Sequence, residues 1–351
     1  MSNHHHFLLL CCPGQGHLNP TLELAKKLTR AAAHVTLATT VRFLRRTTAL
    51  PAIDNLSYAT FSDGYDDGPD PTADLAVVMS ETKRAGSQTL AQLLGSISAE
   101  GRPVTFLIYA VLLPWAAAVA REFHLPSAFL SIQSATTFAI YHRYFNTHDG
   151  LYPDKTTTQM SIKLPGLPLF SPNEVPSFLL PDSPFASVVP TFQEHIQTLE
   201  TDPNPLILVN TFDELEKDSI RAVDHMTVIP IGPGCGGRGG GEVGRCLEVV
   251  MGGGERGEEI RRRCLEWKGL GKGTVVEGGS SHKNWGTVFG KVRVNLEKIE
   301  GVSNLIVETD RDIYVQDTDV FYMTFEIDMH RVRLMFVEVL HFIIDELAKC
   351  K

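Results

Sequence analysis

Short apolar runs alternate with amphipathic helical patterns from Phe7 to about Pro230, and this alternation constrains the fold more than any other feature of the sequence. Short runs that are apolar throughout are typical of strands buried on both faces, as in a parallel sheet covered by helices. The runs of strand length cover 7–12, 34–40, 56–62, 104–110, 127–132, 205–212 and 227–231. Helical spacing fills most of the intervals, so the sequence predicts an α/β fold with a doubly wound parallel sheet.

Two segments interrupt this pattern. Residues 150–184 are rich in proline and longer than an ordinary connection, so we expect a loop that overhangs a ligand cleft. Residues 232–241 (GPGCGGRGGG) cannot hold a packed element and are interpreted as a linker or a deletion scar. Beyond them, 242–287 has helical spacing, whereas 288–351 alternates like strands before a final helical stretch. We therefore expect a first domain at 1–231, the linker, a helical segment and a tail of unknown origin.

The composition narrows the range of partners. A formal net charge of -9 offers no basic surface to nucleic acid or anionic lipid. No apolar run approaches the ~20 residues of a membrane span, and the short run after His6 lacks the features of a signal peptide. The six cysteines show no CxxC pair and no metal-ligand spacing, which favours free thiols in a reducing compartment and no metal site. We expect a soluble cytoplasmic monomer that binds neither nucleic acid nor membranes.

The stretch CCPGQGHLNP, residues 11–20, joins the first apolar run to the first helical pattern, and we expect Pro20 at the helix start. Loops at the carboxyl ends of parallel strands are where open α/β sheets bind ligands. His17 in this loop is a candidate general base, because imidazole titrates near neutral pH; alternatively, it caps the helix. Gly14 and Gly16 let backbone N–H groups approach a diphosphate, or they serve only the tight turn.

A second glycine pattern, GxGxxG, is formed by Gly232, Gly234 and Gly237 directly after a strand-like run. This spacing is typical of dinucleotide-binding loops, in which a helix follows the glycines. Pro233 and the further glycines leave no helix start here, so we interpret the run as part of the linker and not as a cofactor site.

Several longer stretches follow one another in a characteristic order between residues 7 and 233: HFLLLCCPGQGHLNPTLELAKKL, VTLATT, SYATFSDGYDDG, VTFLIYAVLLPWAAAVAREFHLPSAFLSIQSATTFAIYHRYF, LPGLP, PLILVNTFDELE and VIPIGP. This order resembles that of the plant UDP-dependent glycosyltransferases of small molecules, which belong to family 1 and have the two-domain GT-B fold. DGYDDG and LLPWAA look most like the branch of the anthocyanidin 5-O-glucosyltransferases and crocetin glucosyltransferases. Residues 242–286 resemble the last helices of that family's second domain, but the donor-binding signature that normally lies between, WCSQ followed by THCGWNSTLE, is missing.

The resemblance implies a GT-B-like fold, with 1–231 as the Rossmann-like acceptor domain and 242–287 as a truncated helical remnant of the donor domain. It implies that His17 is the catalytic base and that Gly14 and Gly16 face the diphosphate of the donor. A UDP-sugar is then the co-substrate, with no other cofactor and no metal. The residues implied to contact the acceptor are Gln15, Gln133, Ser134 and Phe178. The alternative for an aromatic residue such as Phe178 is packing in the core.

The family's aspartate that orients the base is replaced by Ala110, and no Asp or Glu occurs between Gly101 and Glu122. The implied function is transfer of glucose from UDP-glucose, with inversion, to a hydroxyl or carboxyl group of a small plant metabolite. Flavonoids, anthocyanidins and apocarotenoid acids are the expected acceptors. Because the donor signature is missing, we expect this chain to be impaired as an enzyme. The alternative is a non-catalytic module that binds aglycones, or an inert truncated remnant.

Overall fold

The computed structural model describes most of the first two thirds of the chain and a small part of the remainder. Short stretches are described between 162 and 183 and between 270 and 288. The continuous segments are 5–47, 50–69, 72–146, 186–223 and 225–232. The tail 289–351, most of the linker and most of the proline-rich segment lie outside the described residues, so the expectations for them are not tested.

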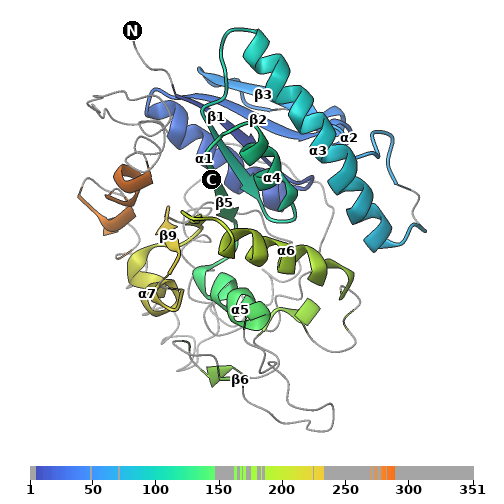
Figure 1. The fold of residues 1–351 in the computed structure, drawn as a ribbon. Coiled ribbons are helices and arrows are strands. Elements are labelled where there is room, and N and C mark those ends of the chain that lie inside the picture. The colour runs from blue at the N-terminus through green and yellow to red at the C-terminus, as the bar shows by residue number, and fades with distance from the viewer. Residues whose placement is uncertain are drawn as a thin grey trace, which may run out of the picture.

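One seven-stranded parallel sheet forms the centre of the molecule (Figure 1), in the order β3-β2-β1-β4-β5-β8-β9. The strands are β1 (His6–Leu10), β2 (His34–Thr40), β3 (Leu56–Phe61), β4 (Phe106–Ala110), β5 (Ser127–Ser131), β8 (Leu206–Val209) and β9 (Thr227–Pro230). Every connection between neighbouring parallel strands must cross over the sheet, which is why helices cover its faces. The doubly wound α/β fold expected from the sequence is confirmed.

Helices connect these strands. They are α1 (Gln15–Arg30), α2 (Val41–Arg46), α3 (Leu75–Ala99), α4 (Trp115–Glu122), α5 (Ala135–Asn146), α6 (Val189–Glu200) and α7 (Asp213–Arg221). The shorter elements are the antiparallel pair β6 (Ile162–Lys163) and β7 (Leu169–Phe170) and the 3₁₀ turns η2 (Ser177–Leu179) and η3 (Ala186–Val188). Among the helices of the described segments, none is long and apolar enough to cross a membrane.

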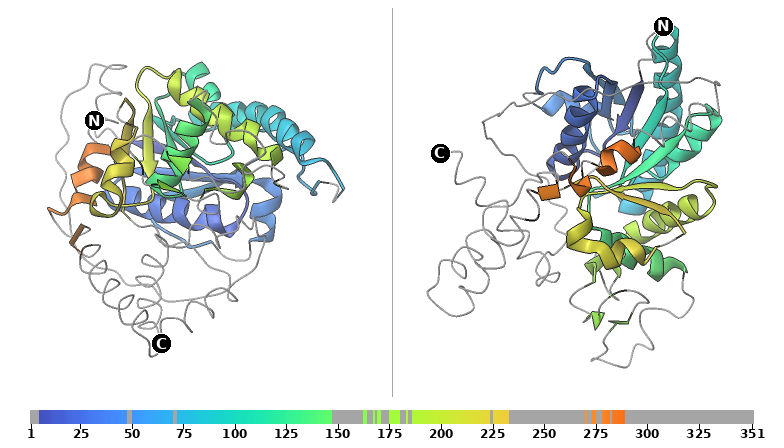
Figure 2. Two further views of the ribbon diagram at one scale, coloured as in Figure 1. Left: turned by 90° about the horizontal axis from the view of Figure 1, so that it is seen from below. Right: turned by 90° about the vertical axis from the view of Figure 1, so that its left-hand side faces the viewer.

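The alternation of side chains along β1 divides the apolar core into two clusters. Phe7 and Leu9 lie in the cluster that α1 covers, whereas Leu8 and Leu10 lie in the cluster on the opposite face. Buried side chains of α3, α4, α5 and α6 complete this second cluster. The views in Figure 2 show α1 on one side of the sheet and α3 to α6 on the other. The four apolar side chains of β1 are at most 1% exposed, so the strand is buried on both faces as its unbroken apolar run predicts.

The first helix begins earlier than the sequence suggests. We expected Pro20 at its start, but α1 begins at Gln15 and contains Pro20. Gly14 precedes it with φ at 125°, a conformation that side chains rarely adopt, and this turns the chain directly from the strand into the helix. Pro20 lies in the second turn, where its missing N–H removes a single backbone hydrogen bond. The expectation that the helix starts at Pro20 is therefore wrong.

A segment from the second half of the chain packs against the first domain. Asn284 donates to a carboxylate oxygen of Asp213 at 2.5 Å, and Ser280 donates to Glu214 at 2.8 Å, both at the start of α7. Val288, only 1% exposed, joins the core cluster beside α1. Both views of Figure 2 show these orange residues against α1 and α7. The described end of the expected 242–287 remnant is thus docked, while the division into four parts stays a prediction.

A buried carboxylate joins α7 to α5. Glu216 is 4% exposed, and its two oxygens accept the backbone N–H groups of Ala135 and Thr136 at 3.0 and 2.9 Å. The Thr136 hydroxyl donates to the same carboxylate at 2.6 Å. These N–H groups open α5 and have no partner within the helix, so an acid from a distant segment caps them and meets the positive end of the helix dipole. At Glu216 itself the backbone leaves helical geometry, with φ at -132° and ψ at 35°.

We predict that Glu216→Gln lowers the free energy of unfolding by about 1.5–3 kcal/mol, the range for hydrogen bonds to charged groups. The amide keeps the volume but turns an N–H₂ group toward a backbone donor. Urea denaturation monitored by circular dichroism measures the change. Asp218→Asn on the exposed side of the same helix is the matched control. Equal midpoints for the two variants would contradict the capping role.

Candidate functional site

The carboxyl edge of the sheet has a switch point beside β1. The chain passes from β1 to β2 on one side, while β4 pairs with β1 on the other side, so the connections after β1 and β4 leave in different directions. Open α/β sheets bind ligands in the crevice outside such a point. The segments that follow β1, β4 and β5 all emerge at this edge, because these strands are parallel neighbours. They contain most of the residues expected at the site.

His17 is the third residue of α1, at this switch point, rather than a residue of the loop before the helix. Its backbone N–H donates to the Gly14 carbonyl at 3.1 Å, and its own carbonyl accepts the Thr21 hydroxyl at 2.8 Å. His17 is partly exposed as a residue, but Nδ1 of its ring is buried and has no hydrogen-bond partner among the described residues. Among the residues that the structure describes, no side chain caps α1. The capping role that we had left open for His17 is therefore absent from the structure.

The protonation state of His17 follows from its burial. Loss of solvent disfavours the imidazolium and lowers the pKa of His17 from 6.5 to about 4. The ring is thus neutral at physiological pH and offers a lone pair, as a general base must. A pKa so far below the working pH also makes it a weak base.

The segment after β4 supplies no carboxylate to His17. Ala110, the position at which we expected the orienting acid to be replaced, is fully buried and is paired with Leu130 of β5. The next carbonyl, of Val111, accepts the Cys12 thiol at 3.2 Å. Within the described part of the chain, Nδ1 of His17 therefore has no acidic partner.

A second histidine, which the sequence analysis did not identify, holds the segment after β4 in place. Leu112 has φ at 71°, an uncommon conformation for a branched side chain, and its N–H donates to Nε2 of His195 at 3.0 Å. His195 comes from α6, is 2% exposed, and stacks on Tyr109 with ring centroids 6.0 Å apart. Its spacing from Phe192 and Leu199 puts His195 on the apolar face of α6. This spacing is the sequence signal from which its burial could have been predicted. Burial lowers its pKa to about 3.

Two residues expected to contact an acceptor follow β5 at the same edge. Gln133 accepts the Tyr141 hydroxyl through Oε1 at 2.9 Å. Ser134 Oγ accepts the backbone N–H of Thr137 at 3.2 Å, so this hydroxyl caps the start of α5. Both side chains are only partly buried, and these contacts fix their orientation at the rim. Their contact with an acceptor stays a prediction.

The other expected acceptor residues lie in contrasting places. Gln15 is exposed at the start of α1. Phe178 is 4% exposed, with its ring 4.5 Å from that of Phe192 and 5.3 Å from that of Tyr141. Packing therefore accounts for the surroundings of Phe178 in the described residues, whereas Gln15 is free to meet a ligand. No observation tests either role.

The two glycines of the first loop differ in what they do for the protein. Gly14 needs its positive φ for the turn into α1, whereas a Cβ atom on Gly16 would meet nothing within 4 Å. The turn therefore explains Gly14, but neither the turn nor the packing of the described residues explains Gly16. Open space at the N-terminus of α1 suits the approach of an anion, because the first N–H groups of a helix lack partners. Diphosphate binding here stays a prediction.

A hollow lies beside this site, on the α1 face of the sheet. Lys27 of α1 donates to the Ile231 carbonyl at 2.9 Å, and its ammonium group lies 5.1 Å from the Trp285 ring centroid. These residues line the hollow with Glu23 and Asn210. His17 is not among its lining residues.

This chain is similar to known proteins in both sequence and fold. The chain is 45% identical over 237 residues to the phloretin 4'-O-glucosyltransferase of Malus domestica, covering 65% of this chain and 49% of that protein. It is 42% identical over 239 residues to the chloroplastic crocetin glucosyltransferase of Gardenia jasminoides, covering 66% and 50%. The structure of Os79 from O. sativa in complex with UDP aligns with a TM-score of 0.53 at 27% identity, covering 64% of this chain and 50% of that one. No family model matches.

The sheet order and the helix that follows β1 match the α/β fold of the GT-B glycosyltransferase structures to which this chain is similar. Over the matched residues, this chain is a homologue of the plant UDP-dependent glycosyltransferases of small molecules, which confirms the resemblance seen in its motifs. The chain spans about half the length of the curated relatives it matches.

We predict that the imidazole of His17 titrates near pH 4, because burial disfavours its charged form. Nuclear magnetic resonance of histidine-labelled protein measures this pKa, and the spectrum of His17→Asn assigns the signal. The signal of His124, an exposed histidine, provides the internal control and should be unchanged in His17→Asn. A midpoint between 6 and 7 for His17 would contradict the burial of the ring.

We also predict that stability falls as the pH drops from 6.5 toward 3. His195 takes up its proton near pH 6.5 in the unfolded chain but only near 3 in the folded one, so acid favours unfolding. Between pH 7 and pH 5 this single group removes about 2 kcal/mol. Urea titrations at each pH should show a shallower dependence for His195→Gln than for the parent. An unchanged dependence in that variant, with His124→Asn as control, would contradict the assignment.

Proposed function

We propose that residues 1–231 are the acceptor-binding half of an inverting UDP-dependent glycosyltransferase, and that this chain alone binds aglycones without transferring glucose. The observation that carries the proposal is a neutral histidine at the switch point of the sheet whose Nδ1 has no acidic partner in the described segments. The relatives support the class of acceptor, since their names specify phloretin, crocetin and an anthocyanidin glucoside. A monomeric state and a cytoplasmic location remain predictions.

In the proposed reaction the oxygen of an acceptor hydroxyl attacks the anomeric carbon of UDP-glucose. Its proton passes to His17, the bond from that carbon to UDP breaks, and UDP leaves with the electron pair, which inverts the configuration. Since Nδ1 is buried, Nε2 is the nitrogen that faces the acceptor. Gly14 and Gly16 would hold the diphosphate at the start of α1, and Gln15, Gln133, Ser134 and Phe178 would surround the acceptor.

The lack of a partner at Nδ1 weakens this base. For Nε2 to accept a proton, the ring hydrogen must lie on Nδ1, where it is buried without an acceptor. An orienting carboxylate normally removes that cost and stabilises the imidazolium. A carboxylic acid acceptor avoids the problem, because it is already ionised at neutral pH.

The missing donor signature limits the chain further. The described first domain offers a diphosphate only a helix start, and none of its expected site residues is assigned to uracil or ribose. Fixing donor and acceptor side by side can lower a reaction barrier by on the order of 7–11 kcal/mol. Without the donor-binding signature, the sequence offers no recognisable residues that would fix the donor. Acceptor binding needs only apolar burial and is expected to survive.

We predict that the purified protein binds a planar phenol such as phloretin, or a polyene acid such as crocetin, with micromolar affinity. Titration calorimetry measures this affinity. His17→Ala should leave it nearly unchanged, because His17 acts when a proton moves in the transition state. His124→Asn serves as the exposed control. Failure of every acceptor to bind would favour an inert remnant.

The same samples should form no glucoside from UDP-glucose, as measured by mass spectrometry against a control without protein. A glucoside formed by the parent but not by His17→Ala would mean that other residues hold the donor. That result would refute the proposal that this chain binds without transfer.

A further inference from the structure

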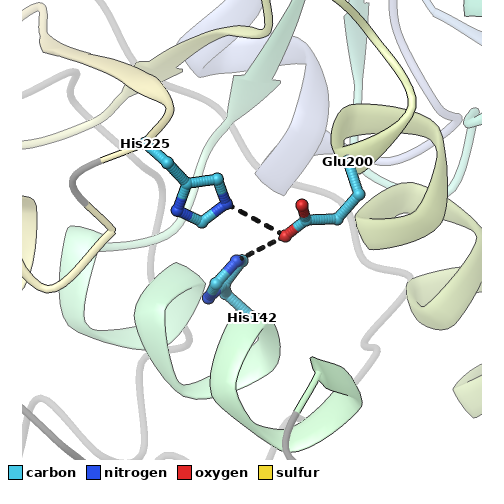
Figure 3. A group of neighbouring side chains, drawn as sticks. All are labelled: His142, Glu200 and His225. Atoms are coloured by element: carbon cyan, nitrogen blue, oxygen red, sulfur yellow. Dashed lines mark hydrogen bonds and ion pairs between the residues drawn. The ribbon is translucent and has the colours of Figure 1, made fainter.

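Two histidines and a glutamate converge at the surface formed by α5, α6 and the turn before β9 (Figure 3). His142 Nε2 lies 2.7 Å from Glu200 Oε1, and His225 Nε2 lies 3.1 Å from the same oxygen. The three ligand atoms all lie within 4.8 Å of one another. In Figure 3 the Glu200 carboxylate faces both imidazole rings, and both dashed lines end on a single oxygen. None of these residues belongs to the proposed glycosyltransferase site.

Hydrogen bonding alone does not satisfy this cluster. Asn146 Nδ2 approaches Glu200 Oε1 at 2.6 Å, so three nitrogens lie within hydrogen-bond distance of one oxygen that has two lone pairs. The same amide nitrogen lies 2.9 Å from His142 Nε2. If that Nε2 carries the hydrogen it needs to donate to Glu200, two donors face each other.

A cation removes this conflict. We propose that His142, Glu200 and His225 bind a divalent transition-metal ion, with Zn²⁺ the best match to two imidazoles and a carboxylate. Each ring then presents a lone pair instead of a hydrogen, and Asn146 keeps its hydrogen bond to the carboxylate as a supporting contact.

The distances from the two imidazole nitrogens to Glu200 fit a tetrahedral zinc site after a small adjustment. Zinc bonds of about 2.0–2.2 Å in a tetrahedron separate neighbouring ligand atoms by roughly 3.3–3.5 Å. This is somewhat more than the 2.7 and 3.1 Å that separate the two imidazole nitrogens from Glu200 Oε1, and it lies within the 4.8 Å that bounds all three ligand atoms. Glu200 ends α6 and its side chain is 32% exposed, so it has room to retreat. The side chain of His225 is 49% exposed, which leaves an entry path and a fourth position for water.

The surroundings of His142 limit the affinity of this site for zinc. Nδ1 of His142 is buried and has no partner among the described residues, although a metal on Nε2 places the ring hydrogen there. Strong zinc sites give that hydrogen an acceptor, and its loss typically weakens binding about 10- to 100-fold. We therefore expect micromolar binding and a structural role: the ion would join α5, α6 and the turn before β9. The ligands lie 58 and 25 residues apart in sequence, so no motif spacing reveals them.

The test uses the full chain with His4 and His5 replaced by asparagine, because consecutive histidines at the N-terminus bind divalent ions themselves. Calorimetric titration of metal-free protein with Zn²⁺ should give one ion per chain. Co²⁺ should give the intense visible absorption of a tetrahedral site. His225→Ala and Glu200→Gln should each weaken Zn²⁺ about tenfold or more, whereas His124→Asn should not.

Thermal unfolding provides a second readout. Saturating Zn²⁺ should raise the melting temperature of the parent but not that of His225→Ala, because only the parent gains binding energy in the folded state. His225 is exposed, so its replacement is expected to fold. No binding by the parent, or equal binding by the parent and both ligand variants, would show that the cluster is only hydrogen-bonded and would overturn the proposal.

Discussion

The parallel pairing of β1 with both β2 and β4 is the constraint on which the rest of the structure depends. It makes β1 an interior strand, which is why its four apolar side chains divide between two separate apolar clusters, one on each face of the sheet. It also sends the connections after β1 and β4 to different sides of the sheet, which opens the carboxyl edge between them. Gly14 turns the chain at this edge so abruptly that α1 begins with His17 in its first turn. The fold therefore places the histidine before any contact specific to the ligand is considered.

Burial of the His17 ring limits the chemistry that this residue can perform. A desolvated imidazole without an acidic partner stays neutral over the whole physiological range, and this suits an acceptor group that needs little help to ionise. The segment that would supply the acid is held by backbone contacts to Cys12 and His195. In the function that we propose, this site binds an acceptor but is weak in proton transfer. The chain spans about half the length of these relatives, and binding without transfer is what we propose for it.

The sequence predicted those features that arise from local periodicity. Apolar runs and helical spacing located the strands and most helices, and the motif order identified the family. The start of α1 was missed because the φ of Gly14 is not encoded in any pattern of apolar residues. The cap of α5 by Glu216, about 80 residues away in sequence, and the contact of His195 with Leu112 were missed because they join distant segments. The cluster of His142, Glu200 and His225 was invisible for the same reason. Phe178 lies in the expected region but packs among aromatic rings, a distinction that composition cannot make.

The structure of the protein with a bound phenolic acceptor tests the central claim most directly. The quantity to measure is the distance from the reactive hydroxyl oxygen to Nε2 of His17. A general base must lie within about 2.6–3.2 Å of the group whose proton it takes, or reach it through one water. The account predicts that distance, with Gln133 and Ser134 at the rim of the bound acceptor. An acceptor seated instead in the hollow beside Trp285, or with its hydroxyl turned away from His17, would contradict it.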